Sequence, residues 1–327
     1  MILYEFCNPL KVLNKLNSLK IKLIRIFNII RYINYPRRTT LIPDTFKACS
    51  MFSKLDYFLH YFEYRTRIKL MNNYPGADVI DCEIGYGKSK HLQKEEVSSI
   101  RAYAKSVEWR EDVQGKKKPF LQSINFNYGD IKELDKLITS PKIIGPVAHY
   151  LGVFPIFHTA TIFYSPNTQN FPGVSQNAHL DNEDVKQIKC WIPLDDITND
   201  SGPLHILPAN KSHDLYKKLL KNKKISVRNQ KIEDKLISKY VTNKEWIKCT
   251  GGVDEIFYTD TCRCYHFGSR KALKPRLVLM LHYASPSSKE VPFFIRKKKK
   301  FKTEDLTYLL GFQGQLFTHK YRRNKNR

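Results

Sequence analysis

The sequence has no long uninterrupted apolar run. Residues 10–33 come nearest to one, but Lys11, Lys15, Lys22 and Arg25 interrupt them, whereas a bilayer-spanning helix needs about 20 mostly apolar residues. The same stretch lacks the short apolar core and the small-residue cleavage site of a secretory signal. We therefore expect neither a transmembrane span nor a signal peptide there.

Cysteine is present, but not in the pattern of a disulfide framework. The seven cysteines are odd in number and scattered, which favours a reducing compartment, so we expect a cytoplasmic protein. Cys262 and Cys264 lie near His266, but the second ligand pair of a structural zinc site is missing. An internal repeat of 20–50 residues is also absent from the sequence.

Acidic residues are few beside basic ones. The chain has 56 Lys and Arg against 31 Asp and Glu, a formal net charge of +25. Such an excess is typical of proteins with an anionic partner: nucleic acid, membrane lipid, or a phosphorylated or CoA-linked substrate. The basic runs are well separated along the chain, so we interpret the charge as general lysine enrichment.

The sequence divides into three parts. Residues 1–44 form a basic N-terminal segment, residues 45–295 the main domain and residues 296–327 a basic tail. Within the first part, residues 10–33 carry an apolar helical stripe. A basic amphipathic helix can lie on an anionic membrane, but we favour packing on its own domain over peripheral membrane contact.

Helical patterns precede residue 155 and strand patterns follow it. The periodicity predicts helices over residues 45–72, 93–106, 131–139 and 141–151. It predicts strands over residues 157–164, 187–194, 204–207 and 277–281, and a turn that feeds a strand over 251–258. A charged, helix-prone insert fills residues 213–246, and one more short element is expected at 306–312.

A candidate metal site begins at His179 and Asp181. These residues are two apart, so in an extended strand their side chains point into the same space. A neutral imidazole and a carboxylate together suit a divalent first-row metal. Such a metal needs a third ligand, and we predict His266, which follows the strand at 251–258. His282 is the alternative.

Arg276 follows His266 by ten residues, which allows one strand to end and the next to start beside it. Two histidines and one carboxylate leave three metal positions open, the arrangement of non-haem Fe(II) oxygenases. A planar guanidinium binds a carboxylate through two hydrogen bonds. A keto acid can therefore chelate the metal at one end and meet Arg276 at the other. Arg270 is the alternative anchor. The chemistry predicted is that of Fe(II), 2-oxoglutarate and O₂.

An ordered set of residues resembles the phytanoyl-CoA dioxygenase family. The match covers roughly residues 155–285 and comprises Gln176, His179 and Asp181, the runs 191–196 and 199–208, Ser212 and His213, the stretch 252–266, and Pro275 and Arg276. The resemblance implies a fold that is mainly β with flanking helices, namely a double-stranded β-helix (a jelly-roll, cupin-like barrel).

The resemblance also implies roles around the metal. Trp191 would line the pocket, with an ordinary core aromatic as the alternative, and Gln176 would orient a ligand or the keto acid. Tyr164 would hydrogen-bond the cosubstrate. Relatives usually carry Ser and Asn shortly after the distal histidine, whereas residues 267–271 read Phe-Gly-Ser-Arg-Lys. Ser269 is the residue here that can take the place of that serine.

We therefore predict a dioxygenase that hydroxylates an unactivated C–H bond of a small-molecule or acyl substrate, with anionic substrates among the candidates, and releases succinate and CO₂. Asp181 favours hydroxylation, because halogenating relatives lack this carboxylate. Two alternatives are kept: a nucleic-acid oxidative demethylase of the same superfamily, and a non-catalytic basic binding protein on the same barrel. Nucleic acid is not favoured, because demethylating relatives carry a different arginine arrangement after the distal histidine.

Overall fold

The computed structural model describes most of the chain between residues 58 and 312. The residues it describes are 58–76, 78–90, 92, 94–109, 121–166, 177–181, 183–184, 186–225, 231–268, 272–288, 291 and 299–312. The predicted N-terminal segment 1–44, with its stripe at 10–33, lies outside these ranges, and so does residue 313 onward.

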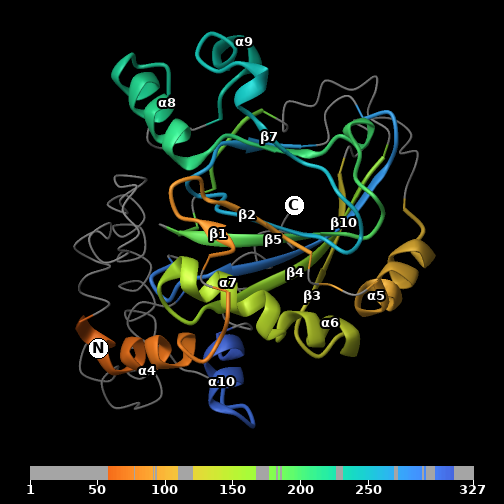
Figure 1. The fold of residues 1–327 in the computed structure, drawn as a ribbon, viewed down its shortest axis with the longest axis vertical. Coiled ribbons are helices and arrows are strands. Elements are labelled where there is room, and N and C mark those ends of the chain that lie inside the picture. Colours follow the sequence, from red (N-terminus) through yellow and green to blue (C-terminus); the bar gives the residue numbers. More distant parts are fainter. Residues whose placement is uncertain are drawn as a thin grey trace, which may run out of the picture.

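Within the described ranges, four helices come before strand β4, close to where the sequence predicts them. They are α4 (Tyr61–Met71), α5 (Lys94–Ser106), α6 (Lys132–Ile138) and α7 (Pro141–Leu151). Helix α7 begins with Pro141, whose fixed φ suits a first helical position, and ends at Gly152 in the left-handed region at φ 74°. Nearly all of α7 is buried, because it packs beneath the large sheet (Figure 1).

The large sheet has seven antiparallel strands in the order β1-β2-β8-β5-β10-β4-β3. Their bounds are β1 Ile80–Asp81, β2 Tyr86–Ser89, β3 Gln122–Phe126, β4 Ile156–Ser165, β5 Gln187–Pro193, β8 Ile256–Thr259 and β10 Arg276–Ala284. The long strands β4, β5 and β10 confirm the predicted strands. The short strands β1, β2 and β3 were not predicted.

The small sheet has three antiparallel strands in the order β7-β6-β9. Its strands are β6 (Leu204–Ile206), β7 (Ile247–Cys249) and β9 (His266–Phe267), and a bridge between His179 and His266 extends it. From β4 onward the chain alternates between the two sheets, with β6 and β7 as a consecutive pair. Two facing antiparallel sheets with this connection form a double-stranded β-helix, as the sequence predicts.

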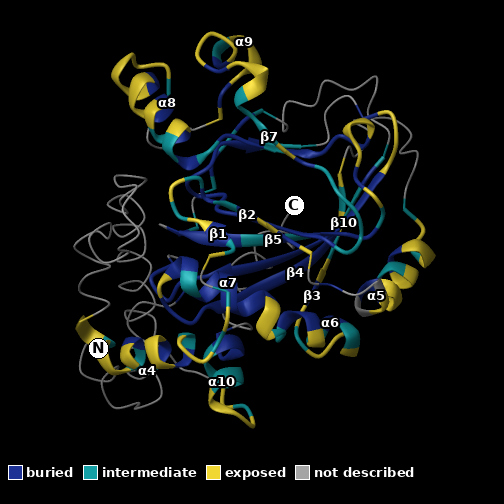
Figure 2. Ribbon diagram, viewed as in Figure 1, coloured by how far each residue is buried: buried dark blue, intermediate teal, exposed yellow. Residues whose placement is uncertain are grey.

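The two faces of the large sheet contact different partners. One face carries alternate apolar side chains such as Ile188, Cys190 and Ile192 of β5, which join the main core cluster under the helices. The other face turns toward the small sheet and encloses the barrel interior, where Trp191 packs with Phe257 of β8. Figure 2 shows the strands buried and the outer faces of the helices exposed.

Helices also close the far side of the small sheet. Helix α8 (Ala209–Lys221) and the short α9 (Asp234–Ile237) lie above β7 in Figure 1 and confirm the helix-prone insert. They cover a second cluster of apolar residues that includes Leu215, Leu219 and Tyr265. The residues around β9 are therefore held between this cluster and the barrel interior.

One detail differs from the apolar periodicity that predicts a helix over residues 45–72. Leu59 and Phe62, which belong to that periodicity, are exposed, whereas Tyr64, Arg67 and Leu70 are buried. Arg67 lies inside because its guanidinium donates to the carbonyls of residues 154, 155 and 308.

The short element expected at residues 306–312 is helix α10 (Glu304–Leu310), whose Leu309 and Leu310 join the main core.

No helix within the described ranges is long and apolar enough to cross a bilayer. The five cysteines in those ranges are free thiols. Four of them are buried, and burial raises the pKa of Cys190 and Cys262 well above the usual thiol value, which keeps both as neutral side chains.

Candidate metal centre

Three side chains from two neighbouring segments meet inside the barrel. His179 and Asp181 come from the segment that pairs with β9 and with the loop before it, and His266 opens β9. One ligand atom from each residue lies within 4.8 Å of the others. His179 Nε2 is 4.0 Å from Asp181 Oδ1, and His266 Nε2 is 3.9 Å from Asp181 Oδ2. Among the described residues this is the cluster of ligating side chains that could hold a metal ion.

Backbone hydrogen bonds fix the two histidines in the tautomer that a metal requires. The Nδ1 atoms of His179 and His266 lie 2.9 Å and 3.0 Å from the carbonyl oxygens of Asn177 and Cys264. A carbonyl only accepts, so each Nδ1 carries the proton and donates it. Each Nε2 faces the cluster and is the nitrogen that a neutral imidazole would offer to a metal. Metal-binding histidines are usually oriented in this way.

Two donors from β5 hold the carboxylate of Asp181. Lys189 Nζ lies 2.5 Å from Asp181 Oδ2, and Gln187 Nε2 lies 3.3 Å from the same oxygen. The backbone N–H of Asp181 donates to Thr261 O at 2.9 Å. Burial alone would raise the pKa of Asp181, but electrostatic interactions with Lys189 and His266 and hydrogen bonds from the side chains of Lys189 and Thr261 lower it well below the usual range. Asp181 is therefore ionised.

His266 is the most buried of the three residues. Burial, together with the neighbouring His179, lowers the pKa of His266 to about 3. The imidazole is then neutral near pH 7, as a metal ligand must be. A neutral imidazole pair and an ionised carboxylate are the donor set that a divalent first-row metal prefers, so these residues fit an Fe(II) ion.

The alternative ligand, His282, lies outside the cluster. It is buried on β10, where its Nε2 donates to Gln187 Oε1 at 2.9 Å and its ring packs on His158 with centroids 4.5 Å apart. Gln187 in turn donates to Thr261 Oγ1 at 2.9 Å and to Asp181. Gln187 thus links His282 to the carboxylate.

Arg276 lies at the start of β10 and faces the small sheet. Its Nη1 donates to Gly202 O at 2.7 Å, and its Nη2 lies 3.4 Å from Ser165 Oγ. Gly268, two residues after His266, allows this approach, because a Cβ there would lie 3.3 Å from Arg276 Nη1. Burial lowers the pKa of Arg276 to about 10, so the guanidinium remains charged at neutral pH.

The structure brings one further predicted residue to the barrel interior. Trp191 of β5 packs against Phe163, with ring centroids 6.1 Å apart, and its Nε1 donates to Thr259 Oγ1 at 2.9 Å. It lies two residues beyond Lys189 and therefore on the same face of the strand. Trp191 lines the interior rather than the helix-side core.

Tyr164 was assigned to the wrong face. It pairs with Leu277 and stacks on Trp109 with ring centroids 5.3 Å apart, within the core under the helices. Its neighbour Ser165 faces Arg276 instead, because successive strand residues point to opposite sides. We therefore withdraw Tyr164 as a cosubstrate ligand. Gln176, Ser269 and Arg270 lie outside the described residues.

Sequence reasoning missed three residues around the carboxylate: Lys189, Gln187 and Thr261. A signal for two of them was present in the Gln-Ile-Lys-Cys-Trp run of β5. Polar residues at alternate positions of a strand whose other face is apolar mark a polar interior. Thr261 lies in the loop after β8, and the sequence carries no comparable signal for it.

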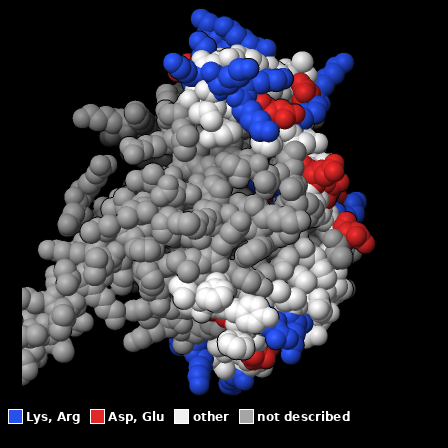
Figure 3. All heavy atoms as spheres, turned by 90° about the vertical axis from the view of Figure 1, so that its left-hand side faces the viewer, with Lys and Arg blue, Asp and Glu red and all other residues white. Residues whose placement is uncertain are grey.

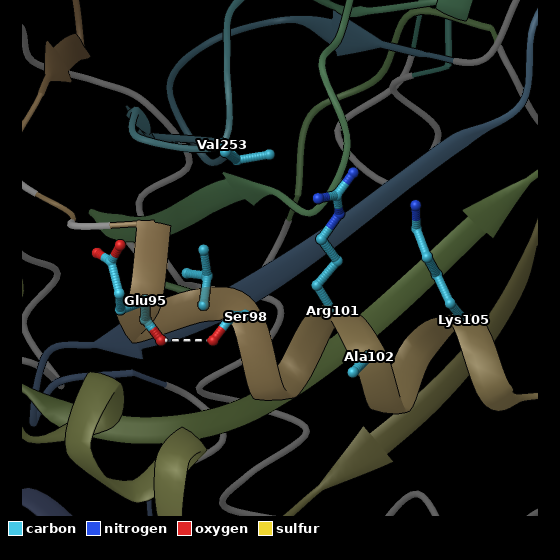
Figure 4. Close-up of a pocket in the computed structure, with 7 residues that line it drawn as sticks. Glu95, Ser98, Arg101, Ala102, Lys105 and Val253 are labelled. Atoms are coloured by element: carbon cyan, nitrogen blue, oxygen red, sulfur yellow. Dashed lines mark hydrogen bonds between the residues drawn. The ribbon is translucent and has the colours of Figure 1, made fainter.

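A separate cavity of about 410 Å³ lies between α5 and the turn before β8. Figure 4 shows Arg101 and Lys105 projecting from α5, with Val253 opposite. Both basic groups are paired, because Asp195 Oδ1 lies close to Arg101 Nη2 and 3.0 Å from Lys105 Nζ. The residues that line this cavity belong neither to the metal cluster nor to the surroundings of Arg276.

One layer of the molecule, around α8 and α9, is rich in exposed lysines. Residues 209–225 and 231–245 carry ten lysines, all exposed, and four acidic residues. Figure 3 shows a group of Lys and Arg side chains at the top of the molecule and a further group at the bottom. The linear sequence, with its separated basic runs, did not place these lysines together.

No protein-family model matches the chain, and no curated protein matches it either. Solved structures do resemble it. One is the non-heme alpha ketoglutarate dependent epimerase SnoN from nogalamycin biosynthesis, 14% identical, with a TM-score of 0.45 and coverage of 66% of this chain and 83% of that one. A second is EctD from S. alaskensis, 15% identical, with a TM-score of 0.46 and coverage of 64% and 76%.

A third is EvdO2 from Micromonospora carbonacea var. aurantiaca, whose structure was determined in complex with 2-oxoglutarate. It is 18% identical, with a TM-score of 0.44, and the match covers 62% of this chain and 87% of that one.

Proposed function

We propose that this chain is an Fe(II)- and 2-oxoglutarate-dependent dioxygenase that oxidises a C–H bond, with hydroxylation as the outcome. The observation that carries the proposal is the cluster of His179, Asp181 and His266. Both imidazoles have Nδ1 engaged by backbone carbonyls, and both direct Nε2 toward the carboxylate. Two histidines and one carboxylate around a metal leave open the positions that a cosubstrate requires.

In this proposal His179 Nε2, His266 Nε2 and Asp181 hold the iron. When bound, the iron with 2-oxoglutarate supplies the reduction of O₂ that converts the keto acid to succinate and CO₂ and oxidises the substrate. The carbonyls of residues 177 and 264 keep both Nδ1 protons in place, so neither imidazole turns away from the site.

Arg276 is the proposed anchor for the far carboxylate of 2-oxoglutarate. Its guanidinium is buried and charged, and Gly202 O and Ser165 Oγ hold it against the small sheet. A fixed planar fork in a site of low dielectric binds a carboxylate strongly and in one orientation. Trp191 and Phe163 supply an apolar wall that limits water around the reacting groups.

A small-molecule or acyl substrate fits this proposal. A nucleic-acid demethylase remains the second candidate, because α8 and α9 present an exposed basic layer. A non-catalytic binding protein is disfavoured, because a chain without a metal has no need for two histidines locked in the metal-binding tautomer beside a carboxylate. We propose a cytoplasmic location, in keeping with the free cysteines of the described ranges.

Anaerobic metal titration and a succinate assay test the proposal. Wild-type protein should bind one Fe(II) per chain and release succinate from 2-oxoglutarate only when iron and O₂ are present. His179→Ala should lose both properties. His205→Ala is the matched control, because His205 also places Nδ1 3.0 Å from a backbone carbonyl, that of Pro203, but lies outside the cluster. Full iron binding and activity in His179→Ala would remove the basis of the proposal.

A further inference from the structure

A lysine of the barrel interior contacts the proposed metal-binding carboxylate. Lys189 lies on β5, where it pairs with His282 of β10 on one side and with Thr259 of β8 on the other. Its Nζ is 2.5 Å from Asp181 Oδ2, and both side chains are about 15% exposed (15% and 14%). This is a largely buried ion pair inside the site, unlike a surface pair with little energetic weight.

The carboxylate of Asp181 is the counter-ion that the Lys189 ammonium contacts inside the barrel. Gln187 Nε2 lies 3.3 Å from the same Asp181 oxygen and so shares the task of holding it. Asp181 Oδ1 lies 4.0 Å from His179 Nε2, and Oδ2, the oxygen that Lys189 contacts, lies 3.9 Å from His266 Nε2.

We propose that Lys189 is a positioning residue that competes with the metal for Asp181. Its ammonium holds Oδ2 and weakens metal binding by placing a second cation on the same carboxylate. This inference rests on the proposed function, because it takes Asp181 as a metal ligand. The contact between Lys189 and Asp181 itself does not depend on that assignment.

Coulomb's law gives the direction in which Lys189 changes the affinity for the metal. The ammonium of Lys189 attracts the carboxylate of Asp181. It also repels a divalent metal ion bound to that carboxylate, and a largely buried site screens this repulsion poorly. The coupling is reciprocal. A bound metal weakens the interaction between Lys189 and Asp181, and Lys189 lowers the affinity for the metal by the same factor. Removing the charge should therefore strengthen metal binding.

Metal titration of charge variants tests the first half of the proposal. Lys189→Met should bind Co(II) or Mn(II) at least tenfold more tightly than wild type under anaerobic conditions, and Lys189→Arg should stay near wild type because the charge remains. Lys88→Met is the matched control, because Lys88 Nζ forms a similar pair with the buried carboxylate of Glu255, at 3.0 Å, away from the cluster. An unchanged or weaker affinity in Lys189→Met overturns the proposal. Lys189→Gln serves the same purpose if Lys189→Met does not fold.

A double-mutant cycle without metal tests the pair itself. In the presence of a chelator, Lys189→Met should lower the Tm, because Asp181 is left buried without its counter-ion. The same substitution should lower the Tm much less in an Asp181→Asn background. Additive effects would show that the pair has no energetic role and overturn the inference. If wild type binds no metal while the cycle shows coupling, the proposed function fails and the ion pair stands.

Discussion

The backbones of His179 and His266 hydrogen-bond to each other, N–H to carbonyl in both directions, at 3.1 Å and 3.0 Å. This reciprocal pair places the two imidazoles on the same side of the small sheet, with ring centroids 4.4 Å apart. The spacing of two proposed metal ligands is therefore set by the sheet rather than by a flexible loop. A site built on paired strands holds its geometry better than one built on loops.

The first prediction separates His266 from its rival. His266→Gln should lose stoichiometric Fe(II) binding, because the cluster is left with one imidazole and one carboxylate. His282→Gln should keep iron and lose on the order of 1–3 kcal/mol of unfolding free energy, because buried Gln187 Oε1 loses a donor. Anaerobic titration and urea denaturation measure the two effects. Iron lost in His282→Gln and kept in His266→Gln would reverse the assignment.

The second prediction concerns the keto-acid anchor. Arg276→Ala should weaken 2-oxoglutarate binding by on the order of 2–5 kcal/mol, since a buried charge-assisted pair is lost, and should leave iron affinity nearly unchanged. Arg276→Lys should recover only part of the loss, because an ammonium lacks the planar fork. Calorimetry with the iron-loaded protein measures both variants. Arg101→Ala is the control, because Arg101 lies on α5 and pairs with Asp195. Wild-type affinity in Arg276→Ala would move the anchor elsewhere.

The third prediction uses the close approach of Gly268 to Arg276. A Cβ at position 268 would lie 3.3 Å from Arg276 Nη1 and 3.4 Å from Nη2. The guanidinium is tethered to Gly202 O, so it must shift by a few tenths of an ångström. Gly268→Ala should weaken 2-oxoglutarate severalfold, less than Arg276→Ala does. It should have no further effect in the Arg276→Ala background. A full additional loss in that background would show that Gly268 acts independently of Arg276.

The positions of the barrel strands could be predicted from the sequence more reliably than which of their side chains face the barrel interior. Strands β5 and β10 were predicted because they are apolar and bounded by turns. Tyr164 was assigned to the wrong side because β4 is buried on both faces, and alternation then does not identify the interior. The short β1, β2 and β3 were missed because two to five residues carry too little periodicity.

The proposed site was recoverable from sequence only where spacing carries geometry. His179 and Asp181 are two apart, and the distance from His266 to Arg276 matches one loop between strands, so each pair was predictable. Lys189 was not singled out, because its contact with Asp181 depends on β5 lying beside the metal segment. The two residues are only eight apart in sequence, but the way the chain turns between them is seen only in the three-dimensional structure.

The fourth prediction concerns pH and His213, at the start of α8. Burial, followed by the charge of Lys217, lowers the pKa of His213 below its usual value, and its Nδ1 is buried without a hydrogen-bond partner. Arg263 also lowers this pKa, whereas Asp214 raises it. At about pH 6.5, the ordinary pKa of histidine, the imidazole of residue 213 is therefore protonated less in the folded state than in the unfolded state. The free energy of unfolding should consequently fall as the pH is lowered through that value.

Urea denaturation between pH 5 and pH 8 measures the effect. One proton corresponds to at most about 1.4 kcal/mol per pH unit, and partial exposure of His213 makes its share smaller. His213→Gln should flatten the acidic side of the stability profile, because the variant has no imidazole to protonate there. Lys217→Gln should give an intermediate slope, because it removes only one of the influences that lower the pKa. An unaltered wild-type slope in His213→Gln would show that another group causes the acid sensitivity.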